Sequence, residues 1–131
     1  MKGLDTNVLV RYLTQDDPAQ ARKANAVLAG AIEHGEPCAI DTVVLCELTW
    51  VLQDAYGFDK AAIVATLARL LDTAQLVVEH ADVARRALED YRRGTGDFAD
   101  YVIGWRNREN GCAETVTFDR ALRRSRLFRV L

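Results

Sequence analysis

Four acidic residues have the type and the placement needed to act together on a metal ion: Asp5, Glu47, Asp100 and Asp119. Each lies directly after an expected strand or near the start of an expected helix. If the first, second and fourth strands are neighbours, the acids converge at the end of a parallel sheet where α/β folds bind ligands. Oxygen ligands suit Mg²⁺ or Mn²⁺. Ions held in this way promote hydrolysis of a phosphodiester, because they neutralise phosphoryl charge and lower the pKa of an attacking water.

Ordinary helix capping offers a second interpretation of most of these acids. Asp5 and Asp119 could cap the helices that follow them, and Asp97 could form a capping pair with Asp100. Such pairs are common because acids favour the first turn of a helix. For each residue taken alone, capping explains the sequence as well as a functional role does.

Glu47 is harder to explain by capping, because it is the only charged residue between Thr42 and Leu52. A helix this apolar is expected to be buried on most sides. An unpaired buried carboxylate costs on the order of several kcal/mol. The pattern therefore predicts either a basic partner from elsewhere in the fold or a divalent metal shared with other acids.

The elements that must position these acids alternate along the chain. Strands are expected near residues 2–4, 37–40, 75–78, 114–118 and 127–130. Helices are expected over residues 8–13, from Pro18 to the closing Gly35, and over 42–56. The second of these has Ala21, Ala24, Leu28 and Ile32 on one face. Further helices are expected after the capping residue Asp59, in the segment that ends at Gly94, over 97–110, and from Arg120. This alternation predicts one α/β domain over residues 1–131, with helices on both faces of a parallel sheet of four to five strands.

The composition narrows the class of protein. No apolar run approaches the roughly 18 residues of a membrane-spanning helix, and the start lacks the pattern of a secretory leader. Cys38, Cys46 and Cys112 are expected to be buried free thiols of a reducing compartment. The absence of a Cys-x-x-Cys pair disfavours a zinc site. We therefore expect a cytoplasmic protein without membrane contact.

Arginines are concentrated near the end of a chain whose net charge is only -2. Arg120, Arg123 and Arg124 are candidates to contact RNA, because a basic rim beside an acidic centre would suit that substrate. The same arginines could simply form a solvated surface, and when this feature is taken alone that interpretation is favoured over RNA contact.

Four short motifs, in order and spread over nearly the whole chain, resemble those of the PIN domain family. They are residues 5–10 (DTNVLV), 47–52 (ELTWVL), 97–104 (DFADYVIG) and 117–122 (TFDRAL). The size resembles that of VapC-type toxins within this family. Gly104 departs from the alanine that many relatives carry, but no acidic position is missing.

The resemblance implies a three-layer α/β/α sandwich and a Mg²⁺- or Mn²⁺-dependent endoribonuclease. Asp5 and Asp100 would be direct metal ligands, Glu47 would bind metal directly or through water, and Asp119 would hold a second ion or orient a water. Thr6, Asn7 and Thr117 would hydrogen-bond the acids or a metal-bound water. Asp97 would be an additional acid of the site, although helix capping is the better explanation of this residue.

The resemblance also implies partners, namely an RNA substrate, a VapB-type antitoxin and a second copy of the chain in a homodimer. An apolar groove for the antitoxin could be lined by Trp50, Val51, Leu52, Ile63, Leu67 and Leu70. Core packing explains each of these residues singly and is the better interpretation.

Other classes of protein fit less well. A phospho-acceptor signalling domain needs an acceptor aspartate after its third strand, where this chain has Glu79 and His80. A haloacid-dehalogenase-type phosphatase needs a second aspartate where Asn7 stands. A non-catalytic PIN-like module that binds RNA or protein is the main alternative, because a fold does not guarantee activity.

Overall fold

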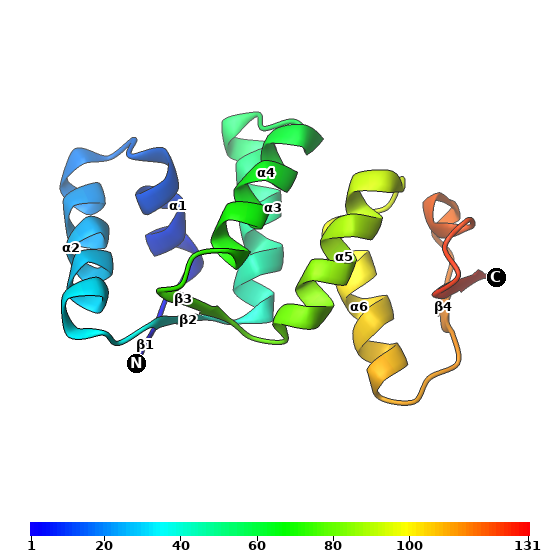
Figure 1. Cartoon of the computed structure of the whole chain (residues 1–131). Coiled ribbons are helices and arrows are strands. Elements are labelled where there is room, and N and C mark those ends of the chain that lie inside the picture. The colour runs from blue at the N-terminus through cyan, green and yellow to red at the C-terminus, as the bar shows by residue number, and fades with distance from the viewer. The chain divides into compact units, whose positions relative to one another are not determined.

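Short parallel strands alternate with helices throughout the computed structural model, which describes residues 1–131 (Figure 1). The chain folds as two units, Met1–Ala81 and Asp82–Leu131. No helix combines the length and the apolar character that crossing a membrane requires.

The first unit is organised by a sheet of three parallel strands in the order β1-β2-β3. The strands are β1 (Lys2–Gly3), β2 (Cys38–Ile40) and β3 (Leu76–Val78). β1 and β2 are aligned so that Lys2 is opposite Cys38, and Cys38 is in turn opposite Leu76. The carboxyl ends of all three strands therefore lie at the same edge, where the chain turns into α1 and α3.

Four helices complete this unit: α1 (Thr6–Thr14), α2 (Pro18–His34), α3 (Thr42–Tyr56) and α4 (Lys60–Leu71). Asp17 and Asp59 begin α2 and α4 as expected, because their side chains accept hydrogen bonds from the Gln20 and Ala62 backbone N–H groups. α1 packs against both α2 and α3, and α4 contacts β3.

The core of the first unit is aliphatic. Fully buried side chains come from α1, α3 and α4, namely Leu9, Leu45, Leu48, Leu52, Ile63 and Leu67. The expected buried face of α2 was wrong at its last position, because Ile32 is 62% exposed and Ala31 is buried in its place. Ala21, Ala24, Leu28 and Ala31 are spaced by three, four and three residues, so they form one face of the helix, and Ile32 falls at the edge of that face.

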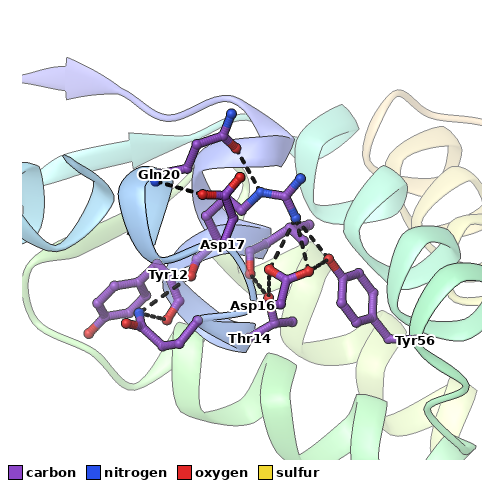
Figure 2. Close-up of polar contacts among 9 residues, drawn as sticks. Tyr12, Thr14, Asp16, Asp17, Gln20 and Tyr56 are labelled. Carbon is purple, nitrogen blue, oxygen red and sulfur yellow. Dashed lines mark hydrogen bonds and ion pairs between the residues drawn. The ribbon is translucent and has the colours of Figure 1, made fainter. Parts of the chain in front are cut away.

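A polar network ties the turn between α1 and α2 to the end of α3 (Figure 2). Tyr56 Oη donates to Asp16 Oδ2 at 2.5 Å, and Thr14 Oγ1 donates to Asp16 Oδ1 at 2.7 Å. Arg11 Nη1 lies 3.1 Å from Asp16 Oδ1 and 2.9 Å from Tyr56 Oη. These contacts lower the pKa of Asp16 to about 2, with the Tyr56 and Thr14 hydrogen bonds and the Arg11 charge as causes.

The second unit contains α5 (Ala81–Arg93), α6 (Phe98–Glu109), β4 (Thr115–Thr117), the 3-10 turn η1 (Arg120–Leu122) and β5 (Phe128–Val130). The Tyr91 and Phe98 rings meet edge to face, with 6.2 Å between their centroids. Trp105 Nε1 donates to Asp90 Oδ2 at 2.7 Å. These contacts fix α5 against α6.

The two strands of the second unit pair with each other. β4 is parallel to β5, with Thr115 opposite Phe128. Residues 118–127 connect the two paired strands, which is close to the dozen or so residues that a parallel crossover requires. The five strands thus form ladders of three and two.

The expectation that all three cysteines are buried was wrong for one of them. Cys38 and Cys46 are buried free thiols, but Cys112 is exposed. It follows Gly111, whose φ of +91° places the chain in an open turn at the end of α6.

Candidate acidic site

Asp5 lies two residues after the end of β1 and directly precedes α1. Its backbone carbonyl accepts hydrogen bonds from the Val8 and Leu9 N–H groups. Its side chain is exposed and makes no capping hydrogen bond, whereas the aspartates that begin α2 and α4 do cap with their side chains. Capping therefore does not explain this carboxylate, which is free to bind a ligand.

Glu47 is connected to the segment that carries Asp5. The Thr6 hydroxyl donates to Glu47 Oε1 at 3.0 Å. Thr6 is buried and directly follows Asp5. Because β1 and β2 are neighbouring parallel strands, the helices that follow them begin side by side and bring these residues together.

The expected burial of Glu47 was wrong. Glu47 is exposed, on a stripe of α3 that also includes Val43 at 63% and Trp50 at 45% exposure. These residues are spaced by four and three positions and so lie on one face of the helix. The apolar residues of α3 bury its other faces, and solvation of Glu47 removes the need for a basic partner.

The acids of the second unit are partly engaged in capping. The Asp97 backbone N–H donates to Asp100 Oδ2 at 3.0 Å. Asp119 Oδ1 accepts from the Ala121 N–H at 2.9 Å, and the Asp119 N–H donates to Thr117 Oγ1 at 3.0 Å. One oxygen of each of these two carboxylates thus has a structural role, and the other oxygen, Oδ1 of Asp100 and Oδ2 of Asp119, has no hydrogen bond.

The pKa of Asp100 is raised above its ordinary value. Burial is the main cause, and the negative charges of Asp97 and Asp119 raise the pKa further, while the hydrogen bond from the Asp97 backbone lowers it. Asp100 is half-buried. Three carboxylates therefore share one region of the second unit and leave it with excess negative charge.

The remaining candidate residues, which are not acids, make no hydrogen bond to the carboxylates of the site. Asn7 is exposed and lines a hollow of about 360 Å³ between α1 and α2 rather than bonding an acid. Thr117 bonds a backbone N–H rather than a carboxylate. Arg120, Arg123 and Arg124 are exposed, and Arg123 Nη1 donates to the Arg120 carbonyl at 2.9 Å.

The PIN domain family matches residues 3–126. The chain belongs to the PIN domain family. A VapC ribonuclease from Aquifex aeolicus (strain VF5) is similar to this PIN domain, with 24% identity over 124 residues that cover 95% of this chain and 91% of that protein. No solved structure matches the chain. The resemblance inferred from the four motifs and the α/β class with parallel strands are both confirmed.

The apolar groove expected in this PIN domain is not formed by the residues named for it. Leu52, Ile63, Leu67 and Leu70 are at most 3% exposed and belong to the core. Trp50 remains exposed, and Val51 is half-buried. Core packing is the correct explanation for most of this set, because α3 and α4 bury these faces within the first unit.

The donor chemistry of the PIN domain fits a hard divalent cation. Neither unit by itself brings three His, Cys, Asp or Glu side chains into a metal-binding arrangement. The acids nevertheless offer only carboxylate oxygens, the type of ligand that Mg²⁺ and Mn²⁺ prefer. Asp5 has no competing hydrogen bond. Burial is the main cause of the raised pKa of Asp100, and the negative charges of Asp97 and Asp119, which a cation would offset, raise it further.

Another acid at a strand end was named from the sequence but was not proposed as a site residue. Glu79 follows β3 directly, and its Oε1 accepts from the Thr42 hydroxyl at 2.9 Å. The Thr42 hydroxyl also lies 3.2 Å from the Glu79 carbonyl. Its position directly after a strand, which it shares with Asp119, was the available signal. Its contacts with the first residue of α3 give it a structural role.

Proposed function

We propose that this PIN domain, residues 1–131, is a Mg²⁺- or Mn²⁺-dependent endoribonuclease that acts as the toxin of a type II toxin–antitoxin pair and inhibits translation by hydrolysing RNA phosphodiester bonds. The observation that carries the proposal is the Asp5 carboxylate, which no capping contact occupies and whose neighbour Thr6 orients Glu47. Similarity to a VapC ribonuclease over 95% of the chain supports the choice of substrate.

The proposed ligands are Asp5 and Glu47 of the first unit with Asp100 and Asp119 of the second, by resemblance to the family. Asp5 and Asp100 bind the metal directly, and Glu47 binds it directly or through a water. Asp119 has Oδ2 available for a second ion or a water, because Oδ1 is used in the cap of η1. Asp97 caps α6, and Asn7 and Thr117 are supporting residues.

The chemistry requires no covalent nucleophile from the protein. When bound, the divalent cation neutralises phosphoryl charge and favours deprotonation of the attacking water. Thr6 limits the orientations of Glu47 through its hydrogen bond. The Asp97 N–H fixes the rotamer of Asp100 and leaves Oδ1 for the ligand. Arg120, Arg123 and Arg124 supply positive charge for the RNA.

The proposal includes the partners that the resemblance implies. A VapB-type antitoxin would hold the enzyme inactive, and two copies would form a homodimer in the cytoplasm. The exposed α3 residues Val43 and Trp50 lie on one face of this helix and are the candidates for such a protein contact.

Cleavage of total RNA by the purified, antitoxin-free protein tests the proposal. The reactions contain Mn²⁺ or EDTA, and the parent protein is compared with the Asp5→Asn and Asp100→Asn variants. Discrete fragments that require both the metal and the two aspartates are expected. Asp54→Asn is the matched control, because Asp54 is an exposed acid of α3 without a hydrogen-bond partner.

Two results would contradict the proposal. Cleavage that persists in EDTA or in both aspartate variants would remove the acidic site from the chemistry. RNA binding without cleavage by the folded parent protein, with transfer, ribosomal and messenger RNA all present, would favour the non-catalytic binding module instead.

A further inference from the structure

A basic groove lies in the second unit, outside the acidic residues themselves. Its volume is about 510 Å³, within the range of sites that hold small ligands. Four guanidinium groups line it, from Arg93, Arg108, Arg124 and Arg126, together with the aromatic side chains of Tyr101 and Trp105. Asp90 is the one acid among its lining residues.

Internal ion pairs cancel only part of the positive charge in this groove. Asp90 accepts the Trp105 Nε1–H, and Arg93 pairs with Glu89 at 2.7 Å. Arg124 and Arg126 are exposed and have no acidic partner, and Arg108 donates only to the Arg126 backbone carbonyl at 3.3 Å. The groove therefore has unneutralised positive charge, which attracts an anionic ligand.

The residues that line the groove follow the acids of the second unit closely along α6 and η1. Tyr101, Trp105 and Arg108 occur at spacings of four and three along α6, so they form one face that starts next to Asp100 and extends about 10 Å along the helix. On the opposite wall, Ala121 follows Asp119 by two residues. RNA whose phosphate is held through a cation at Asp100 and Asp119 would extend toward this groove.

The groove is held open by a loop with fixed geometry. Thr95 Oγ1 donates to the Ala121 carbonyl, and the Gly96 N–H donates to Tyr101 Oη at 3.1 Å. A Cβ at Gly94 would overlap Tyr101 Oη, and one at Gly96 would overlap Leu122. These contacts join the loop to both α6 and η1, so the lining residues are positioned before a ligand binds.

Trp105 gives the groove a surface for a base. The Arg86 guanidinium lies 5.1 Å from the centre of the indole ring. The hydrogen bond from Trp105 Nε1 to Asp90 fixes the edge of the ring. Trp105 remains half-exposed and lines the groove. Guanidinium groups beside an aromatic ring are the combination that binds single-stranded nucleic acid, through phosphate contacts and stacking of bases.

We propose that this groove binds single-stranded RNA adjacent to the cleaved phosphodiester, with Arg124 and Arg126 contacting phosphates and Trp105 contacting a base. The inference rests on the proposed ribonuclease function and adds a substrate-binding site to it. Among the three arginines considered from the sequence, Arg124 lines the groove, whereas Arg120 and Arg123 do not.

RNA binding without hydrolysis tests this site. A labelled short single-stranded RNA is titrated in EDTA from about 50 to 200 mM KCl. The double variant Arg124→Gln/Arg126→Gln is expected to bind roughly tenfold more weakly at low salt, and the slope of log K against log salt should fall by about 1.4, because each arginine that no longer neutralises a phosphate lowers it by about 0.7. Arg22→Gln, which removes an exposed and unpaired arginine of α2, is the control and should match the parent protein.

A second measurement reports contact at Trp105 directly. The chain has two tryptophans, so a Trp50→Phe variant leaves Trp105 as the only indole, and Trp50 is exposed enough to be replaced without disturbing the core. RNA is expected to quench this fluorescence. The quenching should weaken in parallel with affinity when Arg124 and Arg126 are also replaced.

The outcomes distinguish this site from the proposed function. An unchanged affinity and salt slope in the folded double variant, or RNA binding without any change in Trp105 fluorescence, would overturn the groove assignment even if cleavage is normal. Groove-dependent binding by a protein that never cleaves RNA would support the groove and reject the ribonuclease. If the double variant loses binding to polyglutamate but keeps its affinity for RNA, the groove binds an acidic protein segment and the RNA assignment is wrong.

Discussion

Thr6 and Glu47 are joined by a hydrogen bond of 3.0 Å between residues 41 positions apart. The bond links the buried first residue of α1 to an exposed carboxylate of α3. Because Asp5 is the neighbour of Thr6 and is not used in capping, one short segment both supplies an acid and orients a second one.

Replacement of Thr6 by valine should impair activity more than stability. The change preserves shape but removes the hydroxyl, so Glu47 gains rotational freedom while water solvates its carboxylate. Loss of a side chain that orients a metal ligand typically lowers metal affinity or activity about 10- to 100-fold. Thr6→Ser should restore both. Titration calorimetry with Mn²⁺ and RNA cleavage measure the effect, and equal metal affinity in Thr6→Val and the parent protein would contradict it.

Replacement of Asp5 by alanine should barely change the free energy of unfolding in EDTA. The Asp5 side chain caps nothing, whereas the Asp59 side chain accepts the Ala62 N–H at 2.8 Å. Asp59→Ala is therefore the matched comparison and should cost about 1 kcal/mol. Urea unfolding measures both variants. A loss in Asp5→Ala as large as that in Asp59→Ala would mean that Asp5 has a structural role.

Mn²⁺ or Mg²⁺ should raise the melting temperature of the parent protein. Binding to the folded state alone stabilises it by about 1.4 kcal/mol when the free ion is at ten times its Kd, which corresponds to a few degrees for a chain of this size. Burial raises the pKa of Asp100, and so do the negative charges of Asp97 and Asp119, which the cation would offset. Asp100→Asn should abolish the shift in differential scanning calorimetry. A melting temperature that millimolar metal leaves unchanged would argue against the site.

Acid should destabilise the protein through Asp16. Its pKa is about 2 in the folded chain, below its unfolded value of about 3.9. The stability that this group contributes is therefore fully present above about pH 4 and is lost as the pH falls toward 2. Asp16→Asn should flatten the dependence of unfolding on pH in that window, and Asp54→Asn should not. Parallel curves for the parent protein and Asp16→Asn would contradict the assignment.

Local signals in the sequence were sufficient to predict most elements. The apolar run from Thr42 to Tyr56 and the glycine after it predicted α3 with its observed bounds. Asp17 and Asp59 predicted the starts of α2 and α4. These features depend on residues within a few positions of one another, and so they can be read without knowledge of the tertiary structure.

Features that depend on tertiary packing were predicted less well. The apolar composition of α3 suggested that Glu47 is buried, but the face of the helix that meets the core is decided by the sheet and by α1. Pairing of β4 with β5 is likewise a tertiary choice. The resemblance to the family named the acids, but only side-chain geometry separates the free carboxylate of Asp5 from the capping oxygens of Asp100 and Asp119.

The loop of Gly94, Thr95 and Gly96 has a genetic consequence. Its one side-chain polar group, the Thr95 hydroxyl, is bonded to the Ala121 carbonyl. Tyr101 and Leu122 occupy the space in which any side chain at the two glycines would lie. Bacteria that survive forced expression of the protein should therefore carry inactivating mutations at these glycines as well as at the acids. In such a screen, the glycine alleles should yield poorly accumulating protein, whereas the acid alleles should yield normal amounts of inactive protein.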